Sequence, residues 1–270
     1  MRLTVQHATE YRYSSAIAYA IQTLRLTPRP YDGLAVLRWR VTGERRLLAS
    51  FTDGYGNLAH CHTVNRPHIA AAVLVEGEVE TSDTGGLVRG APEPLPPVFF
   101  LRETPLTASS DAVRALAQDG ARGGDALTRM TSLMDAVRNR IGYRAGVTGS
   151  ATTADAALRI GAGVCQDHAH VFIAAARALG VPARYVGGYL WAGANGTEFE
   201  ASHAWAEAWI DGHGWVGFDP SNRTRANESH VRTAVGLDYW SAAPVRGIRR
   251  GLAEEQLAVK VQVIRSGAEQ

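Results

Sequence analysis

The apolar residues of this chain change their spacing once, and a proline-rich stretch marks the change. Before residue 85 they alternate with polar residues or form short runs, as in LTVQHATEYRY and AAAVLVEGEVE, a pattern typical of β-strands. Asp-Gly and Gly-Asn pairs in YDGL and TDGYGN favour tight turns between these runs. Residues 1–88 are therefore predicted to form an antiparallel β-sandwich-like domain.

The proline-rich stretch is a predicted domain boundary. Five prolines lie between Pro92 and Pro105, and the fixed φ and missing N–H of proline suit an extended connector, so residues 89–106 are expected to be a linker. After it, DAVRALAQDGA and DALTRMTSLMDAVRNRI have helical spacing, and strands are expected at ARYVGGYLW, SHAWAEAWI, GWVGFD and LAVKVQVI. Residues 107–270, with this C-terminal strand, are predicted to form the second domain of an α+β chain.

Composition and charge exclude several classes of protein. The chain has 46% hydrophobic and 20% charged residues and a net charge of +2, and its basic residues are spread out, so we expect no nucleic-acid partner. No run reaches the roughly 18 apolar residues of a membrane helix, and the first residues alternate like a strand rather than a signal peptide. We therefore expect a cytoplasmic protein that does not bind membranes.

Cys165 stands where a glycine-containing turn leads into a predicted helix, in GAGVCQDHAH followed by VFIAAARALG. Unpaired N–H groups and the positive end of the helix dipole favour the thiolate, which is the nucleophilic form. Gly161 and Gly163 permit the turn, and free N–H groups there could hold an oxyanion. Cys165 is thus the predicted nucleophile, whereas Cys61, in the strand-like AHCHTV, is expected to be structural. The two cysteines form no CxxC pair, which argues against a zinc site or disulfide framework.

A thiol nucleophile needs a base that a third group orients, and His203 and Asp219 are the candidates. They lie on two predicted strands joined by the turn DGHG. A two-residue loop would pair Asp219 with Ala206, whose side chain faces away from His203, whereas a three-residue loop of residues 211–213 would pair it with Trp205, on the same face as His203. We predict an odd-length loop or a bulge in this hairpin.

His168 and His170 follow the cysteine closely but do not predict a metal site with His203. Residues two positions apart on a helix point to nearly opposite faces, so we expect no metal and no cofactor. Asp167 is explained by the preference for negative charge at a helix start. Glu207 is either a second carboxylate near the site or a surface residue. The residues proposed to line a substrate cleft are Tyr143, Gln166, His168 and Trp205, although a packing role is preferred for His168 and Trp205.

These segments resemble a known family. GVCQDHAHVFIAAARALGVPARYVGGYL, SHAWAEAWI and GWVGFDPSN are similar to the bacterial transglutaminase-like cysteine enzymes, relatives of the papain-like fold, in the order Cys, His, Asp. LTVQHATEYRYS and LRLTPRP look like the β-rich domain that precedes the core in many bacterial members. The resemblance implies a helix carrying Cys165 packed on an antiparallel sheet, with His203 as general base and acid and Asp219 orienting it.

The resemblance also implies acyl transfer from peptide or amide bonds through an acyl-enzyme. We expect hydrolysis, as by a cysteine peptidase or amidase, because many bacterial relatives look like proteases and no D-x-D-x-D-G calcium loop is present. An amine acceptor would instead give cross-linking or ligation by a transglutaminase. A non-catalytic scaffold is the other alternative. The expected partner is a peptide or protein substrate, and a homo-oligomer or a partner protein bound through the N-terminal β domain stays open.

Overall fold

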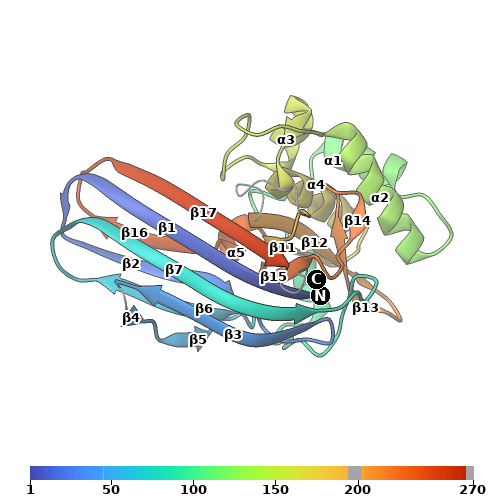
Figure 1. Cartoon of the computed structure of the whole chain (residues 1–270). Helices are drawn as coiled ribbons and strands as arrows, with labels where there is room; N and C mark the ends of the chain where they lie inside the picture. The colour runs from blue at the N-terminus through green and yellow to red at the C-terminus, as the bar shows by residue number, and fades with distance from the viewer. Residues whose placement is uncertain (45, 194–201, 266–270) are drawn as a thin grey trace.

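A long β-sandwich lies beside a helix-covered sheet in the computed structural model (Figure 1), which describes residues 1–44, 46–193 and 202–265. Every second residue from Leu3 to Tyr13 is buried, so the alternation in the sequence places one face of each long strand in the sandwich core. One sheet has the order β17-β1-β7-β3-β4, formed by β1 (Arg2–Ile17), β3 (Leu34–Gly43), β4 (Arg46–Leu47), β7 (His68–Thr81) and β17 (Glu255–Arg265). The other has the order β16-β2-β6-β5, formed by β2 (Tyr19–Thr27), β5 (Ser50–Thr52), β6 (Leu58–Val64) and β16 (Val245–Arg250).

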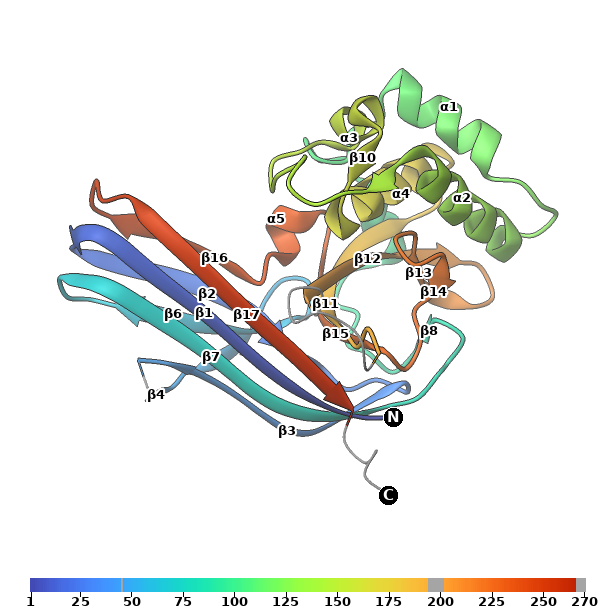
Figure 2. The ribbon, with the colours of Figure 1, turned by 45° about the horizontal axis from the view of Figure 1, so that its top comes forward.

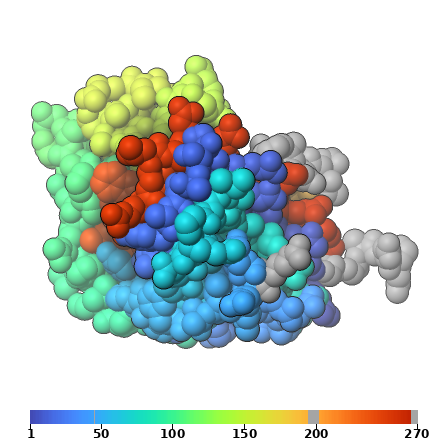
Figure 3. Space-filling view, turned by 90° about the vertical axis from the view of Figure 1, so that its left-hand side faces the viewer, coloured from blue at the N-terminus to red at the C-terminus, as the bar shows by residue number. Residues whose placement is uncertain are grey.

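The last two strands return to the N-terminal sandwich. β17 pairs with β1 from Leu3↔Arg265 to Tyr13↔Glu255, and β16 pairs with β2. Seen from the far end of the sandwich, C-terminal residues in red lie directly against the first strands in blue (Figure 3). This differs from the expectation that the C-terminal strand belongs with residues 107–270. An alternating strand can complete either sheet, and β1 and β2 otherwise leave free edges.

The second part is built on the sheet β14-β13-β12-β11-β15. Helix α4 packs on the sheet face that carries Ala204, Ala206 and Ala208, because these small side chains allow close approach. Three of the other helices, α1 to α3, pack around α4 (Figure 2). Its strands are β11 (Ala183–Leu190), β12 (Ser202–Ile210), β13 (Gly214–Asp219), β14 (Thr224–Arg225) and β15 (His230–Gly236), and its helices are α1 (Asp111–Gly120), α2 (Ala126–Arg140), α3 (Ala154–Ile160), α4 (Cys165–Ala178) and α5 (Tyr239–Ala242).

Three of the helices begin directly after a capping side chain. Ser110, Asp125 and Thr153 precede α1, α2 and α3, and each side chain accepts a backbone N–H of the first turn. A short parallel pair, β9 (Gly142–Tyr143) with β10 (Ala162–Gly163), leads into α4. Among the described residues, no helix has the length and apolar character needed to span a membrane. The α+β fold expected from the sequence is confirmed.

The proline-rich segment is folded against the second part rather than simply extended. It is preceded by β8 (Leu87–Val88), which pairs with β13, and it contains the 3₁₀ helix η1 (Pro97–Leu101). Phe100 is buried with its ring 5.2 Å from that of Trp215, and its carbonyl accepts a hydrogen bond from Arg177 Nε at 2.8 Å. Phe100 supplies this anchor, since burying such a side chain stabilises the contact.

The sandwich and the second part share a buried interface. The side-chain amide of Asn57 donates to the carbonyl of Val235 and accepts its N–H, both at 2.8 Å, as a neighbouring strand would. An apolar cluster lies across the same boundary. Its buried members are Leu3, Val5, Leu34, Val79, Tyr189, Val231 and Val261.

Candidate active site

Cys165 is the first residue of α4, and the turn before it is held by Asp167. The Asp167 carboxylate accepts the Val164 N–H at 2.8 Å and the Thr148 hydroxyl at 2.6 Å. A Cβ on Gly163 would lie 2.6 Å from an Asp167 carboxylate oxygen, so only glycine fits there. The helix-start role predicted for Asp167 is confirmed, and it places the thiol at the positive end of the helix.

The hairpin between β12 and β13 has the predicted register. Ile210 pairs with Gly214, which leaves a three-residue loop of residues 211–213, and the pairing continues to Ala206↔Phe218. The next step of this register brings Asp219 opposite Trp205, on the face that carries His203. Local loop length therefore decides that the imidazole and the carboxylate share a face.

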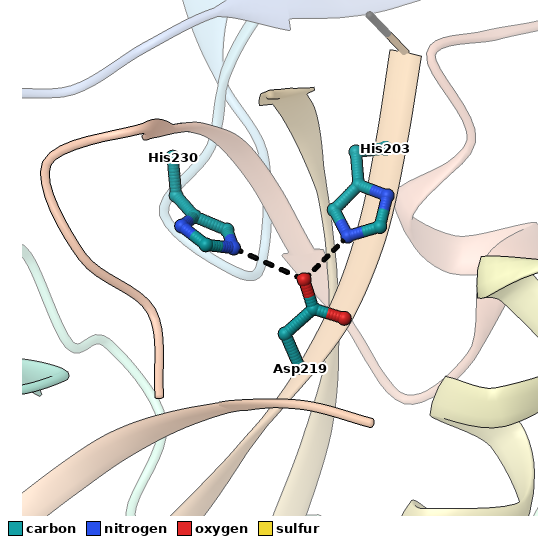
Figure 4. Close-up of side chains that lie close together, drawn as sticks. All are labelled: His203, Asp219 and His230. Atoms are coloured by element: carbon teal, nitrogen blue, oxygen red, sulfur yellow. Dashed lines mark hydrogen bonds and ion pairs between the residues drawn. The ribbon is translucent and has the colours of Figure 1, made fainter. Parts of the chain in front are cut away.

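His203 and Asp219 form a buried hydrogen bond, with Nε2 and Oδ2 2.7 Å apart (Figure 4). Asn222 donates its side-chain amide to the same oxygen at 2.7 Å and its backbone N–H to Oδ1 at 3.3 Å. Burial alone would raise the pKa of Asp219, but the charge and hydrogen bond of His203 and the hydrogen bond of His230 hold it well below its usual range. The carboxylate is therefore ionised at neutral pH.

His203 connects this carboxylate to Cys165. Burial would lower the pKa of His203, but the charge and hydrogen bond of Asp219 outweigh it, and a hydrogen bond to Cys165 with the charge of the thiolate adds to them. Together they raise the pKa of His203 to about 10. Because Nε2 is bonded to Asp219, Nδ1 is left for the thiol. The arrangement favours an imidazolium that is bonded to the Asp219 carboxylate and faces Cys165.

His230, at the start of β15, is a site residue that the sequence analysis missed. Its Nε2 lies 3.2 Å from Asp219 Oδ2, the oxygen that His203 also contacts (Figure 4). No motif or spacing marks it, since β15 reaches the site by pairing with β11 rather than with the hairpin.

The same three residues are the group among the described residues whose side chains could surround a metal ion. His203, Asp219 and His230 offer ligand atoms that all lie within 4.8 Å of one another. The contacts of 2.7 and 3.2 Å to one carboxylate oxygen are hydrogen-bond lengths, however, and two imidazoles donating to one oxygen explain them. In this arrangement Asp219 orients the imidazole of His203, and His230 holds Asp219 in place.

A cleft of about 260 Å³ lies between the sandwich and the second part, and Cys165 and His203 both line it. His7, Arg25 and Leu26 of the sandwich form part of its wall. Besides Cys165 and His203, the other lining residues are Val164, Gln166, Tyr185, Gly187, Gly188, Tyr189, Ser202, Ala204, Thr233, Tyr239, Ala242 and Pro244. The N-terminal domain thus shapes the surroundings of the thiol.

Gln166 lines the cleft, as proposed from the sequence. Tyr143, His168 and Trp205 were also proposed to line it, but they are not among the residues of its wall. His168 is buried, with Nδ1 and Nε2 each 2.9 Å from a backbone carbonyl, and Tyr143 stacks on its ring. Trp205 is buried in a cluster with Val186 and Val235, and its ring stacks on that of His203. These contacts agree with the packing roles preferred for His168 and Trp205.

Two other polar residues have structural surroundings. His170 is buried, and its Nε2 accepts the Tyr239 N–H at 3.0 Å, away from His203. Glu207 is neither at the surface nor at the thiol. It is fully buried and bonded to Arg184 at 2.6 Å and to Arg232 at 2.7 Å. The two arginines come from β11 and β15, whose positions only the folded sheet decides.

Comparison with known proteins places this chain in a family. A model of the transglutaminase-like superfamily matches residues 114–220, and a model of the bacterial transglutaminase-like N-terminal region matches residues 3–80. The protein ML0607 of Mycobacterium leprae is 30% identical over 98% of this chain and 99% of its own length. Rv2569c of Mycobacterium tuberculosis is 30% identical over 92% of this chain and 87% of its own. The chain belongs to the transglutaminase-like superfamily.

A solved structure has the same fold. A crystal structure from Cytophaga hutchinsonii, entitled "a Putative Cysteine Protease", superposes with a TM-score of 0.80 over the whole of this chain and 92% of that one, at 20% sequence identity. The match spans both the sandwich and the second part. Family membership and fold together support a cysteine-based enzyme of the transglutaminase-like type.

Proposed function

We propose that the chain is an acyl-transfer enzyme that cleaves amide bonds through Cys165, His203 and Asp219. The hydrogen bond of 2.7 Å between His203 and Asp219, beside a cleft that His203 and Cys165 both line, carries this proposal. A nucleophile, a base and a group that orients the base are the parts such chemistry requires.

In the first step the Cys165 sulfur attacks the carbonyl carbon of a bound amide, and a C–S bond forms as the carbonyl electron pair moves to oxygen. The Cys165 N–H, at the first helical position, lacks an acceptor within the helix and is the natural first donor to that oxyanion. His203 then gives its Nδ1 proton to the leaving nitrogen, the C–N bond breaks, and a thioester remains. Asp219 stabilises the imidazolium before this transfer.

We assign the second oxyanion donor to Tyr185. It is buried, lines the cleft, and lies close enough to Cys165 for the thiolate charge to affect it. Burial is the main cause that raises its pKa well above the ordinary value, with the Cys165 charge adding to it. The hydroxyl therefore keeps its proton and can donate it. Tyr185→Phe is expected to lower kcat by roughly ten- to a thousandfold with little change in KM.

The acceptor decides the product. Water regenerates the thiol and completes hydrolysis, which we propose as the main reaction, and an amine would give a new amide. The test is to incubate the protein with short peptides, follow products by mass spectrometry, and repeat the incubation with hydroxylamine. Hydroxamate would report the amine-accepting alternative, and the free acid would report hydrolysis.

Matched variants connect the reaction to these residues. Cys165→Ala should abolish turnover, and Asp219→Asn should lower kcat by roughly 10²- to 10⁴-fold because the imidazole loses its charged partner. Cys61→Ser, which removes the exposed second thiol, serves as the control and should keep full activity. Turnover that survives in Cys165→Ala would contradict the proposal.

A further inference from the structure

Arg25, on β2 of the sandwich, lines the same cleft as Cys165 and His203. Its side chain is largely buried, with 14% exposed. Its Nε donates to Asp53 at 2.7 Å, so one edge of the guanidinium is occupied. Its Nη1 is buried and has no hydrogen-bond acceptor among the described residues. Arg25 therefore keeps a hydrogen-bond donor that no described residue satisfies, beside a cleft that a ligand can enter.

The support behind Arg25 fixes the guanidinium. The Asp53 carboxylate is held by the backbone N–H groups of Tyr55 and Asn57 at 2.9 and 3.0 Å and by the Asn57 side chain at 3.1 Å. Asn57 is in turn bonded to Val235 of β15. The orientation of Arg25 is therefore tied to the sheet that carries His203, which is how a binding residue is held rigidly.

The position of Arg25 in the cleft favours an anion. Arg25 is cationic, and His203, whose raised pKa keeps it protonated at neutral pH, is paired with Asp219 and Cys165. Among the lining residues that the structure describes there is no aspartate or glutamate. The carboxylate of Asp53 accepts from Nε of Arg25, whereas Nη1 has no acceptor among the described residues. A guanidinium in this position suits a carboxylate, which accepts from two of its N–H groups.

We propose that Arg25 binds a carboxylate of the substrate, so that the enzyme selects amides that carry a negative charge next to the bond it cleaves. This assignment rests on the proposed function, because it takes Cys165 as the reacting group. The carboxylate is either the free C-terminus of a peptide or an acidic side chain. In both cases the N-terminal sandwich contributes directly to specificity.

The first test needs no natural substrate. Iodoacetyl-glycine, iodoacetyl-β-alanine and iodoacetyl-γ-aminobutyrate place a carboxylate at increasing distances from the carbon that the thiol attacks, and the corresponding amides are neutral controls. In Cys61→Ser protein, we expect the ratio of acid to amide alkylation rates to peak at one length, about tenfold above the ratio for N-acetylcysteine. Arg25→Gln should abolish the peak, Arg25→Lys should keep part of it, and Arg29→Gln, an exposed arginine of the same domain, should leave it unchanged.

A ratio that does not vary with length, or a peak that survives in Arg25→Gln, would overturn the proposal. A peak that survives in Arg25→Gln would mean that the His203 imidazolium alone attracts the anion. If Cys165 does not react at all, the result counts against the proposed function rather than against the role of Arg25. A binding measurement that does not require the thiol then tests Arg25 separately.

The binding measurement uses Cys165→Ala protein, titrated by NMR with acetyl-Ala-Ala, acetyl-Ala-Glu-amide and acetyl-Ala-Gln-amide. Preference for the first over the third identifies a C-terminal carboxylate, and preference for the second identifies an acidic side chain. Either preference should fall about tenfold in the double variant that adds Arg25→Gln. Equal binding of the three peptides would overturn the assignment of Arg25, whatever the thiol does.

Discussion

His230 Nε2 lies 3.2 Å from Asp219 Oδ2, the oxygen that is 2.7 Å from His203 Nε2. The backbone N–H of Asn227 donates to His230 Nδ1 at 3.2 Å, so we assign the His230 hydrogen to Nε2, which then donates to the carboxylate. Asp219 is thus fixed between two imidazoles. His230 orients the Asp219 carboxylate, which in turn orients His203.

We expect His230→Leu to lower kcat by about tenfold with KM unchanged, because a hydrogen bond to a charged group is lost. His230→Gln keeps an amide donor and should recover most of the activity. A purely structural role would lower the free energy of unfolding without this selective effect on kcat, and steady-state kinetics together with denaturant unfolding of both variants distinguishes the two.

The raised pKa of His203 predicts how stability depends on pH. The pKa of His203 is about 10 in the folded protein and near 6.5 when the chain unfolds. The pairing of protonated His203 with Asp219 therefore stabilises the fold fully below pH 6.5. This stabilisation is lost as the pH rises toward 10. Denaturant unfolding between pH 6 and 10 should show the wild type losing about 2 kcal/mol more than His203→Gln. Parallel curves for the two proteins would contradict the pairing.

The rate of alkylation of Cys165 should depend on His203. In Cys61→Ser protein, we expect iodoacetamide to react at pH 6 roughly 10- to 100-fold faster than in the same protein with His203→Ala, because the imidazolium holds the thiolate. The two rates should converge above pH 9. Cys61, which is exposed, is measured in Cys165→Ala protein and provides the reference profile. The same profile for Cys165 and Cys61 would mean that the nucleophile is not activated.

Asn57 should contribute to stability through the contact between the two parts. Asn57→Ala leaves the N–H and carbonyl of Val235 and the Asp53 carboxylate with fewer partners, so we expect a loss of about 1–3 kcal/mol in the free energy of unfolding. Chemical denaturation measures it. Asn65→Ala, at an exposed position, is the control and should change stability by less than about 0.5 kcal/mol.

Glu207 should be essential to the fold rather than to the chemistry. Glu207→Ala leaves the buried Arg184 and the largely buried Arg232 without their shared carboxylate, so we expect a loss of about 3–5 kcal/mol in the free energy of unfolding. Glu255→Ala breaks a more exposed pair with Arg249 and should cost at most about 1 kcal/mol. Equal effects in thermal or denaturant unfolding would contradict a structural role for the buried network.

Features that depend on neighbours in sequence were predictable. Ser110, Asp125 and Thr153 begin their helices because a short polar side chain can satisfy the N–H groups of the next turn, which is a local property. Loop length alone placed Asp219 on the face of His203, because side chains along a strand alternate with a period of two. Cys165 at a helix start follows from the turn before it.

Features that depend on which elements meet were decided by the tertiary structure. His230 reaches Asp219, and Glu207 is enclosed by two arginines, because β15 pairs with β11. Arg25 enters the cleft because the sandwich packs against the sheet of the second part, and β17 returns to β1. An amino-acid pattern states which face of a strand is apolar but not which partner covers it. Long-range packing makes that choice, because the buried area and the hydrogen bonds come from both partners together.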